Sequence, residues 1–437
     1  MAQFNRSSVW ISAFLISIVF ATGLFIGRGS SPALSAENDT YEELKVFTEV
    51  LSLTEKNYVD EVNAKDLVYG AIRGILSTLD PHSVFMTPEM YKEVQVDTKG
   101  EFGGLGIQIG IKDNHLSVIS PIEDTPAFRA GIEAGDWIIK VENEPTKDMT
   151  LMEAVQKMRG PRGSQISLTI AREGVKDPMV FNITRDVIKI TSVKSRMLED
   201  HIGYIRISQF QERTGKDLSQ AIRDLKKAGM DSLVLDLRNN PGGLLKAALE
   251  VSEQFLPPGK LIVSIKGRDQ KKDEYRSTLS GNFEKEPMIV MVNGGSASAS
   301  EIVAGAMQDW ARAAILGTTS YGKGSVQTIL PLSDNSGLRL TTARYYTPKG
   351  RSIHNIGVTP DIVVEPKAAE PENPAGSEKA PLGKDHPPVI ENPDKKPESD
   401  ADKDRTVEND VQLKEAVGLL KTWRIFKDLK VAQEIPS

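Results

Sequence analysis

Cysteine is absent from the 437 residues of the chain, and histidine is scarce, with five residues. Without cysteine the protein forms no disulfide, no thiolate zinc site and no cysteine nucleophile, and it has no attachment point for a lipoprotein anchor. No two histidines are paired at metal-ligand spacing and no HExxH motif is present, so we expect neither a metal nor another cofactor. A Ser-His-Asp triad stays open, because its members converge in space rather than in sequence. The histidines are His82, His115, His201, His354 and His386.

An excess of basic residues is also missing. The chain has 54 Lys and Arg against 60 Asp and Glu, a formal net charge of −6. This charge supplies no basic field to neutralise phosphates, so we expect no nucleic-acid partner. The length predicts two or three domains.

The N-terminus has the pattern of an export signal. Arg6 precedes an apolar run over residues 9–26, and small residues follow through Ala36. The run is longer than a usual signal peptide core and just meets the roughly 18 residues that span a bilayer. We therefore interpret residues 1–36 as a signal peptide or a retained membrane anchor. Both readings predict an extracytoplasmic protein, in the periplasm or cell envelope, and the second adds membrane contact through this segment.

The two ends of the remaining chain are predicted to be helical. Residues 37–97 repeat apolar side chains at helical spacing, which predicts an N-terminal helical arm. Residues 367–405 are rich in Pro, Glu, Lys and Asp and are expected to be a disordered linker. Residues 406–431 form an amphipathic helix that is not stable alone. It must dock, either within the subunit or on a partner.

Residues 98–185 change to short alternating strands separated by glycine turns. The stretch contains Gly104-Leu105-Gly106-Ile107, a helix opening at Pro126, and a later helix over residues 151–158. In this combination it resembles a PDZ domain. The resemblance implies that the loop carrying Gly104, Leu105, Gly106 and Ile107 presents backbone N–H groups to the terminal carboxylate of a ligand, which then adds a strand to the sheet.

Residues 186–366 alternate strands with helices, which predicts an α/β layered domain. In this region a buried strand over residues 288–292 is followed by glycines and by Ser296, Ser298 and Ser300 at the start of a helix. Unpaired N–H groups and the helix dipole stabilise negative charge there, as attack on a carbonyl requires. The same serines also satisfy a purely structural role, because Ser298 and Glu301 are spaced as a capping box.

Lys323 lies between two glycines, just before an apolar strand. If the segment is extended throughout, Lys323, Ser325 and Gln327 share one face. To act as a base near neutral pH, the lysine must lower its pKa by about 3 units, which burial can supply. The plain alternative is a flexible surface lysine in a turn.

A phosphate-binding loop is a rival interpretation of the same residues. Gly317 to Lys323 match GxxxxGK. The next residue is Gly324 rather than the Ser or Thr that holds magnesium, and the pattern that follows predicts a strand instead of a helix. We therefore do not expect nucleotide binding.

Asp236-Leu-Arg-Asn-Asn-Pro-Gly-Gly243 forms a third informative segment, a strand end followed by a glycine turn. Its backbone N–H groups could complete an oxyanion site. An ordinary strand-to-helix turn would have the same composition, with Asn and Gly there for positive φ.

Taken in order, DLRNNPGG, NGGSASASE and YGKGSVQ resemble the carboxyl-terminal processing (tail-specific) proteases of the peptidase S41 type, in which a PDZ domain precedes these motifs. The resemblance covers about residues 41–366. It implies a multidomain α/β protein whose protease core, residues 186–366, has the crotonase-like β/α spiral fold. It also implies a site with the middle serine as nucleophile, a lysine base, a glutamine that positions the lysine, and two backbone oxyanion donors, with Gly242 as an alternative donor. These are Ser298, Lys323, Gln327, Gly243 and Ala299.

The implied activity is that of a serine endopeptidase that forms an acyl-enzyme. Its substrates would be unfolded or extended C-terminal tails held by the PDZ domain, with an adaptor protein as a further partner. The terminal helices suggest a homo-oligomer. The competing hypothesis is a non-catalytic exported scaffold whose PDZ domain binds C-termini.

Overall fold

The computed structural model describes residues 32–112, 115–278, 280–366 and 406–433. They fall into two compact units, of which the first ends at Thr78. This unit holds α2 (Pro32–Asn57) and α3 (Ala64–Ser77), in agreement with the helical spacing of its sequence.

Within the described ranges, no helix is both long enough and apolar enough to cross a bilayer. The apolar run over residues 9–26 and the predicted linker over residues 367–405 lie outside those ranges.

The second unit begins at Leu79 and continues with a β-rich domain. Its main sheet has the strand order β3-β4-β5-β7-β8, with β6 paired to β5, while β2 pairs with β9. Alternate side chains of the sheet, among them Val118, Ile138 and Leu168, form a separate hydrophobic core. In chain order, the elements from Leu79 to Lys189 are β1 (Val84–Met86), which belongs to another sheet, α4 (Pro88–Lys99), β2 (Glu101–Gly104), β3 (Ile107–Lys112), β4 (His115–Pro121), α5 (Pro126–Ala130), β5 (Trp137–Val141), β6 (Glu144–Pro145), α6 (Leu151–Met158), β7 (Gln165–Ala171), β8 (Met179–Thr184) and β9 (Asp186–Lys189).

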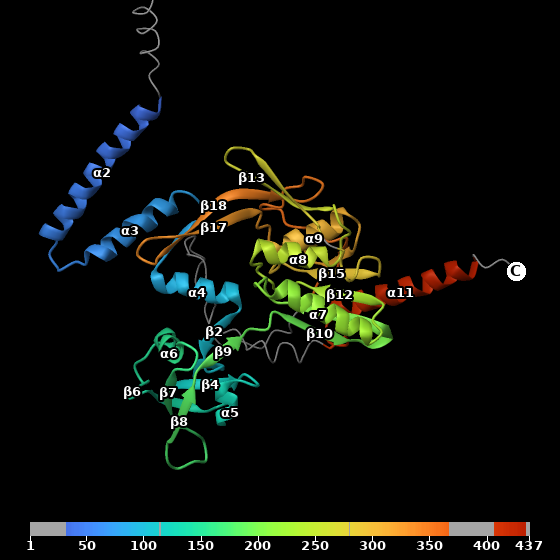
Figure 1. The fold of residues 1–437 in the computed structure, drawn as a ribbon, viewed down its shortest axis with the longest axis horizontal. Coiled ribbons are helices and arrows are strands. Elements are labelled where there is room, and N and C mark those ends of the chain that lie inside the picture. The colour runs from blue at the N-terminus through green and yellow to red at the C-terminus, as the bar shows by residue number, and fades with distance from the viewer. Residues whose placement is uncertain (1–31, 113–114, 279, 367–405, 434–437) are drawn as a thin grey trace, which may run out of the picture. The chain divides into compact units, whose positions relative to one another are not determined.

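The α/β domain is built on a six-stranded sheet of order β10-β11-β12-β15-β16-β19. All neighbouring pairs are parallel except β10 with β11. Parallel strands require crossover connections, which α7, α8 and α9 supply (Figure 1). Its elements are β10 (Val193–Met197), the 3₁₀ helix Glu199–His201, β11 (Ile202–Ile207), α7 (Thr214–Lys227), β12 (Ser232–Asp236), α8 (Leu245–Glu253), β15 (Met288–Val292), α9 (Ala299–Asp309), β16 (Ala314–Gly317) and β19 (Ile362–Val363).

Both faces of this sheet are buried, because its side chains alternate between two cores. Leu233 and Leu235 of β12 face the cluster that contains α7, α8 and α9. Val234 faces the opposite cluster, which includes Leu413 and Val417 of α11 (Val411–Gln433). The C-terminal helix, red in Figure 1, therefore docks within the subunit, one of the two options that the sequence left open.

A second, antiparallel sheet carries the segment after β16. Its order is β1-β18-β13-β14, with β17 also paired to β18. Its remaining elements are β13 (Leu261–Gly267), β14 (Lys272–Arg276), β17 (Ser325–Pro331) and β18 (Gly337–Tyr346). The predicted multidomain α/β architecture is confirmed.

Candidate active site

Ser298 occupies a strained turn between the buried strand β15 and helix α9. It is the residue immediately before the helix and has φ 56° and ψ −111°. A side chain with positive φ costs of order 1–3 kcal/mol and persists only where the surroundings hold it. The turn therefore holds Ser298 in a conformation that it would not adopt alone.

The three serines of this turn differ in how their hydroxyls are used. Ser296 and Ser300 are fully buried, and their hydroxyls donate to the carbonyls of Leu237 at 2.8 Å and Asn240 at 2.9 Å. Ser298 is half-buried, its side chain forms a capping box with Glu301, and its hydroxyl lies near the Tyr345 phenol. Among the described residues, Ser298 is thus the serine of this cluster whose hydroxyl donates to no backbone carbonyl.

The fully buried carboxyl group of Glu301 joins the serine turn to the lysine turn. Its Oε2 atom accepts hydrogen bonds from the backbone N–H of Ser298 at 2.8 Å and of Lys323 at 2.9 Å. Its Oε1 atom accepts from the Ser320 hydroxyl at 2.5 Å and from the Gly322 N–H at 2.7 Å. The capping-box spacing suggested the first of these bonds. Nothing in the sequence indicated that the same carboxyl would hold Lys323.

Lys323 lies in the turn that precedes β17. Burial lowers the pKa of its amine, and the nearby Arg339 guanidinium lowers it further, while Glu301 acts in the opposite direction. The Lys323 carbonyl accepts a hydrogen bond from the hydroxyl of Tyr345, the residue that also reaches Ser298. The direction of the Lys323 pKa is the one that a general base needs.

The structure does not place Gln327 as predicted from a single extended segment, in which Lys323, Ser325 and Gln327 would share one face. β17 begins at Ser325, after Lys323, and a bulge interrupts the pairing with β18 between Val326 and Gln327. Simple alternation therefore does not align Lys323 with Gln327. The Gln327 side chain donates to the Ser325 hydroxyl at 2.7 Å. The described part of the chain shows no hydrogen bond between Gln327 and Lys323.

The turn that contains Gly242 and Gly243 packs directly against Ser298. A Cβ atom added to Gly242 would lie 2.8 Å from the Ser298 Cβ and 3.0 Å from the Ala299 nitrogen. The Gly242 N–H donates to the Asn240 side chain at 2.9 Å. No acceptor within the described ranges pairs with the N–H of Gly243 or with that of Ala299, the first residue of α9.

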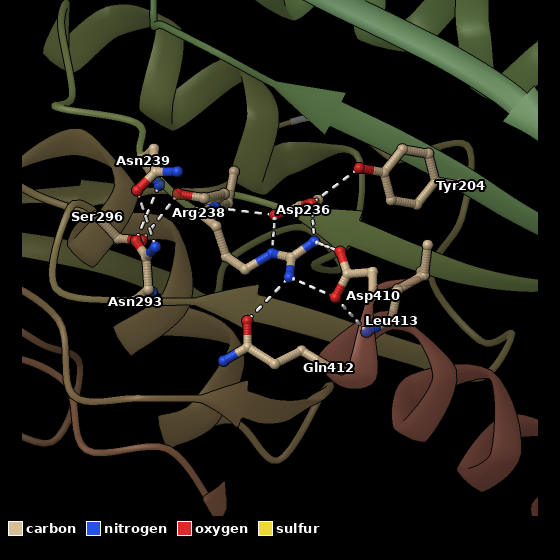
Figure 2. A network of polar contacts seen from close by, with 10 residues as sticks. Tyr204, Asp236, Arg238, Asn239, Asn293, Ser296, Asp410, Gln412 and Leu413 are labelled. Carbon is tan, nitrogen blue, oxygen red and sulfur yellow. Dashed lines mark hydrogen bonds and ion pairs between the residues drawn. The ribbon is translucent and has the colours of Figure 1, made fainter. Parts of the chain in front are cut away.

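Side chains join this turn to the serine turn. Asn293 accepts from the Asn239 N–H at 2.9 Å, and the Asn293 amide donates to the Asn239 side chain at 2.9 Å (Figure 2). The buried Asn240 carbonyl accepts from the Ala297 N–H at 3.0 Å as well as from Ser300. The two turns are thus fixed relative to each other.

His82 lies near Lys323, although the sequence gave no signal for it. Burial and then the charge of Lys323 lower the pKa of His82, whereas the Asp80 carboxylate opposes them. The Asp80 side chain also accepts from the His82 N–H at 2.8 Å.

The segment that matched a phosphate-binding loop does not lead into a helix. β16 ends at Gly317, a turn carries Lys323, and β17 follows. A phosphate-binding loop must open a helix, so the geometry agrees with the rejection of nucleotide binding.

The predicted carboxylate-binding loop joins β2 to β3 in the other domain. The carbonyl of Leu105 accepts from Ala127 at 2.9 Å, and that of Gly106 accepts from Ile122 at 2.8 Å. In the part of the chain that the structure describes, the N–H groups of Leu105 and Gly106 have no acceptor. Gly104 ends β2 and Ile107 begins β3.

Three family models match the chain. They are peptidase family S41 over residues 201–364, the PDZ domain over residues 93–171, and the N-terminal domain of the activating protease CtpB over residues 28–90.

Curated relatives and solved structures match most of the chain. A carboxy-terminal-processing protease of Bartonella bacilliformis is 49% identical over 357 residues, which cover 80% of this chain and 82% of the relative. The carboxy-terminal processing protease CtpB of Bacillus subtilis is 36% identical over 334 residues, 76% of this chain and 69% of the relative. A solved photosystem II D1 C-terminal processing protease aligns with a TM-score of 0.44 at 30% identity, over 73% of this chain and 92% of that one.

We predict that Gly243→Ala destabilises the fold. The new Cβ would lie 2.1 Å from the Phe210 carbonyl oxygen, at a φ of 141°. Strain of this kind costs about 1–3 kcal/mol, and the clash adds to it. Urea unfolding measures the change. Gly294→Ala is the matched control, because its added Cβ meets no atom within 4 Å. Equal stability of the two variants would contradict the tight packing described for Gly243.

Proposed function

Because the chain belongs to peptidase family S41, the family of the carboxy-terminal-processing proteases, we propose that Ser298 and Lys323 form the Ser-Lys dyad of a serine endopeptidase. The observation that carries this proposal is Glu301, whose single Oε2 atom accepts from the backbone N–H of both residues. The Ser298 hydroxyl, which donates to no backbone carbonyl of the described residues, and the lowered pKa of Lys323 support the same assignment. A non-catalytic scaffold is not favoured by any feature of this site.

The reaction is acyl transfer. Neutral Lys323 takes the proton from the Ser298 hydroxyl as its oxygen bonds to the scissile carbonyl carbon. The tetrahedral intermediate collapses, the C–N bond breaks, and the leaving amine takes the proton from the Lys323 ammonium. Water then attacks the acyl-enzyme by the same route and releases the new carboxyl terminus.

Gly243 and Ala299 supply the two oxyanion donors in this proposal. Their N–H groups have no acceptor among the described residues, whereas the N–H of Gly242 is already bonded to Asn240. This difference favours Gly243 over Gly242. One such donor is worth about 3–4 kcal/mol of barrier.

Gln327 acts as the residue that positions the Lys323 amine. Two observations support this role. Gln327 lies on β17, the strand that follows the lysine turn, and its side chain is held by the hydrogen bond to the Ser325 hydroxyl. An amide oxygen turned toward Lys323 would accept from the amine and direct its lone pair to Ser298.

The PDZ domain binds the C-terminal tail of an unfolded or extended substrate through Gly104, Leu105, Gly106 and Ile107. The unpaired N–H groups of Leu105 and Gly106 support this role, because a terminal carboxylate needs such donors. An adaptor that presents its own tail would use the same loop.

Export and self-association complete the proposal. The segment over residues 1–36 directs the chain to the periplasm or cell envelope, as a cleaved signal or an anchor, which cell fractionation would distinguish.

Exposed apolar residues on the terminal helices support a homo-oligomer, and sedimentation velocity measures its size. They include Leu44 and Phe47 on α2 and Trp423, Ile425 and Phe426 on α11.

We expect Ser298→Ala and Lys323→Ala each to lower cleavage of a denatured protein by about 10⁴-fold or more, since removal of one member of such a unit disables the whole. Ser300→Ala is the control, because it removes only a structural hydroxyl worth about 1 kcal/mol. Gel assays and circular dichroism measure activity and folding. A folded Ser298→Ala variant with full activity would refute the dyad.

On the acid side of the pH–rate profile, kcat/KM should follow the titration of the Lys323 amine. Activity rises with pH through the lowered pKa of Lys323, because only the neutral amine accepts a proton. Arg339→Gln removes a charge that lowers this pKa, so the rising limb should move to higher pH. Arg344→Gln, at an exposed position of the same strand, is the control. A pH–rate profile that is unchanged by Arg339→Gln would exclude Lys323 as the titrating base.

Amidation of the C-terminus of a peptide substrate should raise KM, because it removes the charge that the Leu105 and Gly106 N–H groups would bind. Steady-state kinetics compare the free acid with the amide, and N-terminal acetylation of the same peptide is the control. Equal KM values for acid and amide would count against carboxylate recognition by this loop.

A further inference from the structure

Arg238 connects the turn beside Ser298 to the C-terminal part of the chain, 172 residues further on. The guanidinium is buried and makes five hydrogen bonds (Figure 2). Two go to Asp236, from Nε at 3.0 Å and from Nη2 at 2.7 Å. Two go to Asp410, from Nη1 at 2.9 Å and from Nη2 at 2.6 Å. The fifth runs from Nη1 to the Gln412 side chain at 2.8 Å.

These partners satisfy every N–H of the guanidinium, so the side chain has one orientation. Asp236 is itself fixed, because its carboxylate also accepts from the Tyr204 hydroxyl at 2.8 Å. Burial alone would raise the pKa of Asp236, but the charge and hydrogen bonds of Arg238 bring it below its usual value. The network is thus ionised and rigid.

Arg238 also begins the turn that leads to Gly243. Its backbone N–H donates to Asp236 at 2.9 Å. The next residues bond to the serine turn through Asn239 and Asn240. The orientation of the Arg238 side chain is therefore transmitted to the start of the Gly243 turn over a few ordered bonds.

The residues that complete the network stand at the start of α11. Asp410 accepts from the Leu413 N–H at 3.0 Å and so caps the helix that it precedes. Gln412 donates to the Val364 carbonyl at 2.7 Å. The apolar face of α11 would dock without either side chain, since Leu413 and Val417 supply the hydrophobic contact.

We propose that Asp410 and Gln412 are positioning residues for catalysis, which act through Arg238 to hold the Gly243 N–H in the direction of the oxyanion. The inference rests on the proposed role of Gly243. A donor displaced by about 1 Å can lower the rate by about 10²-fold, so a distant residue that fixes it has a measurable effect. The C-terminal helix is in this view part of the catalytic support as well as of the core.

Asp410→Asn tests this in the full-length protein, since it keeps the shape and capping ability of the side chain but removes its charge. We expect kcat for a peptide substrate to fall by about 10- to 100-fold with KM unchanged. The inhibition constant of a peptide aldehyde, whose adduct carries the oxyanion, should rise by a similar factor. A merely structural residue would instead lower the melting temperature and leave these constants unchanged for the folded fraction.

The matched control is Lys421→Ala with Arg424→Ala. These side chains also join α11 to the rest of the domain, through Lys421 to Asp200 at 2.7 Å and Arg424 to Asp231 at 3.5 Å, but they are not part of the Arg238 network. The control should keep the wild-type kcat. If Asp410→Asn does not fold, Gln412→Met replaces it as the test, because it removes one of the five bonds. It should lower kcat and leave KM unchanged, with a smaller effect than Asp410→Asn.

A folded Asp410→Asn or Gln412→Met with wild-type kcat and aldehyde affinity would overturn the inference. An equal loss of kcat in the control variant would also overturn the inference. It would show that any weakening of the contacts of α11 lowers kcat, whether or not the Arg238 network is affected. Failure of the Ser-Lys proposal gives a different result, an active Ser298→Ala variant.

Discussion

Neighbouring parallel strands end at the same edge of a sheet, and this constraint brings the turns that carry the three sequence motifs together. β12, β15 and β16 are adjacent and parallel, and each is followed by one of the three informative turns. Segments that are distant in sequence therefore meet at one edge, where α/β proteins generally bind ligands. The glycine-rich turn, the serine turn and the lysine turn are all products of this arrangement.

Adjacent turns still need to be held in register, and buried polar side chains do this. Glu301 carries out this task between Ser298 and Lys323 with four hydrogen bonds, and the buried Ser300 hydroxyl joins the serine turn to the glycine turn by donating to the Asn240 backbone carbonyl. A buried carboxyl group without partners would be strongly destabilising, whereas one with four donors is satisfied. The same bonds hold Ser298 in its strained conformation.

The electrostatic environment of Lys323 is a balance of opposing terms. Burial and Arg339 favour the neutral amine, while Glu301 favours the ammonium. Glu301 can join the two turns only by lying near the Lys323 amine, and Arg339 counteracts its effect on the pKa of that amine. On the other face of the sheet, α11 covers apolar side chains and brings Asp410 to Arg238. The helix that completes the core on this face thus also supplies a partner of the turn beside Ser298.

The sequence by itself determined the α/β class, the family resemblance and the three motifs, because strand alternation, glycine turns and short motifs are local patterns. It left three serines as candidates on turn chemistry, since each has the same local environment along the chain. The family resemblance implied the middle one, Ser298. The tertiary structure supplied the physical distinction, because it buries Ser296 and Ser300 against distant carbonyls. The sequence also did not predict three other features: the bulge before Gln327, the dual role of Glu301 and the proximity of His82 to Lys323. They depend on contacts between segments far apart in the chain, which no local pattern encodes.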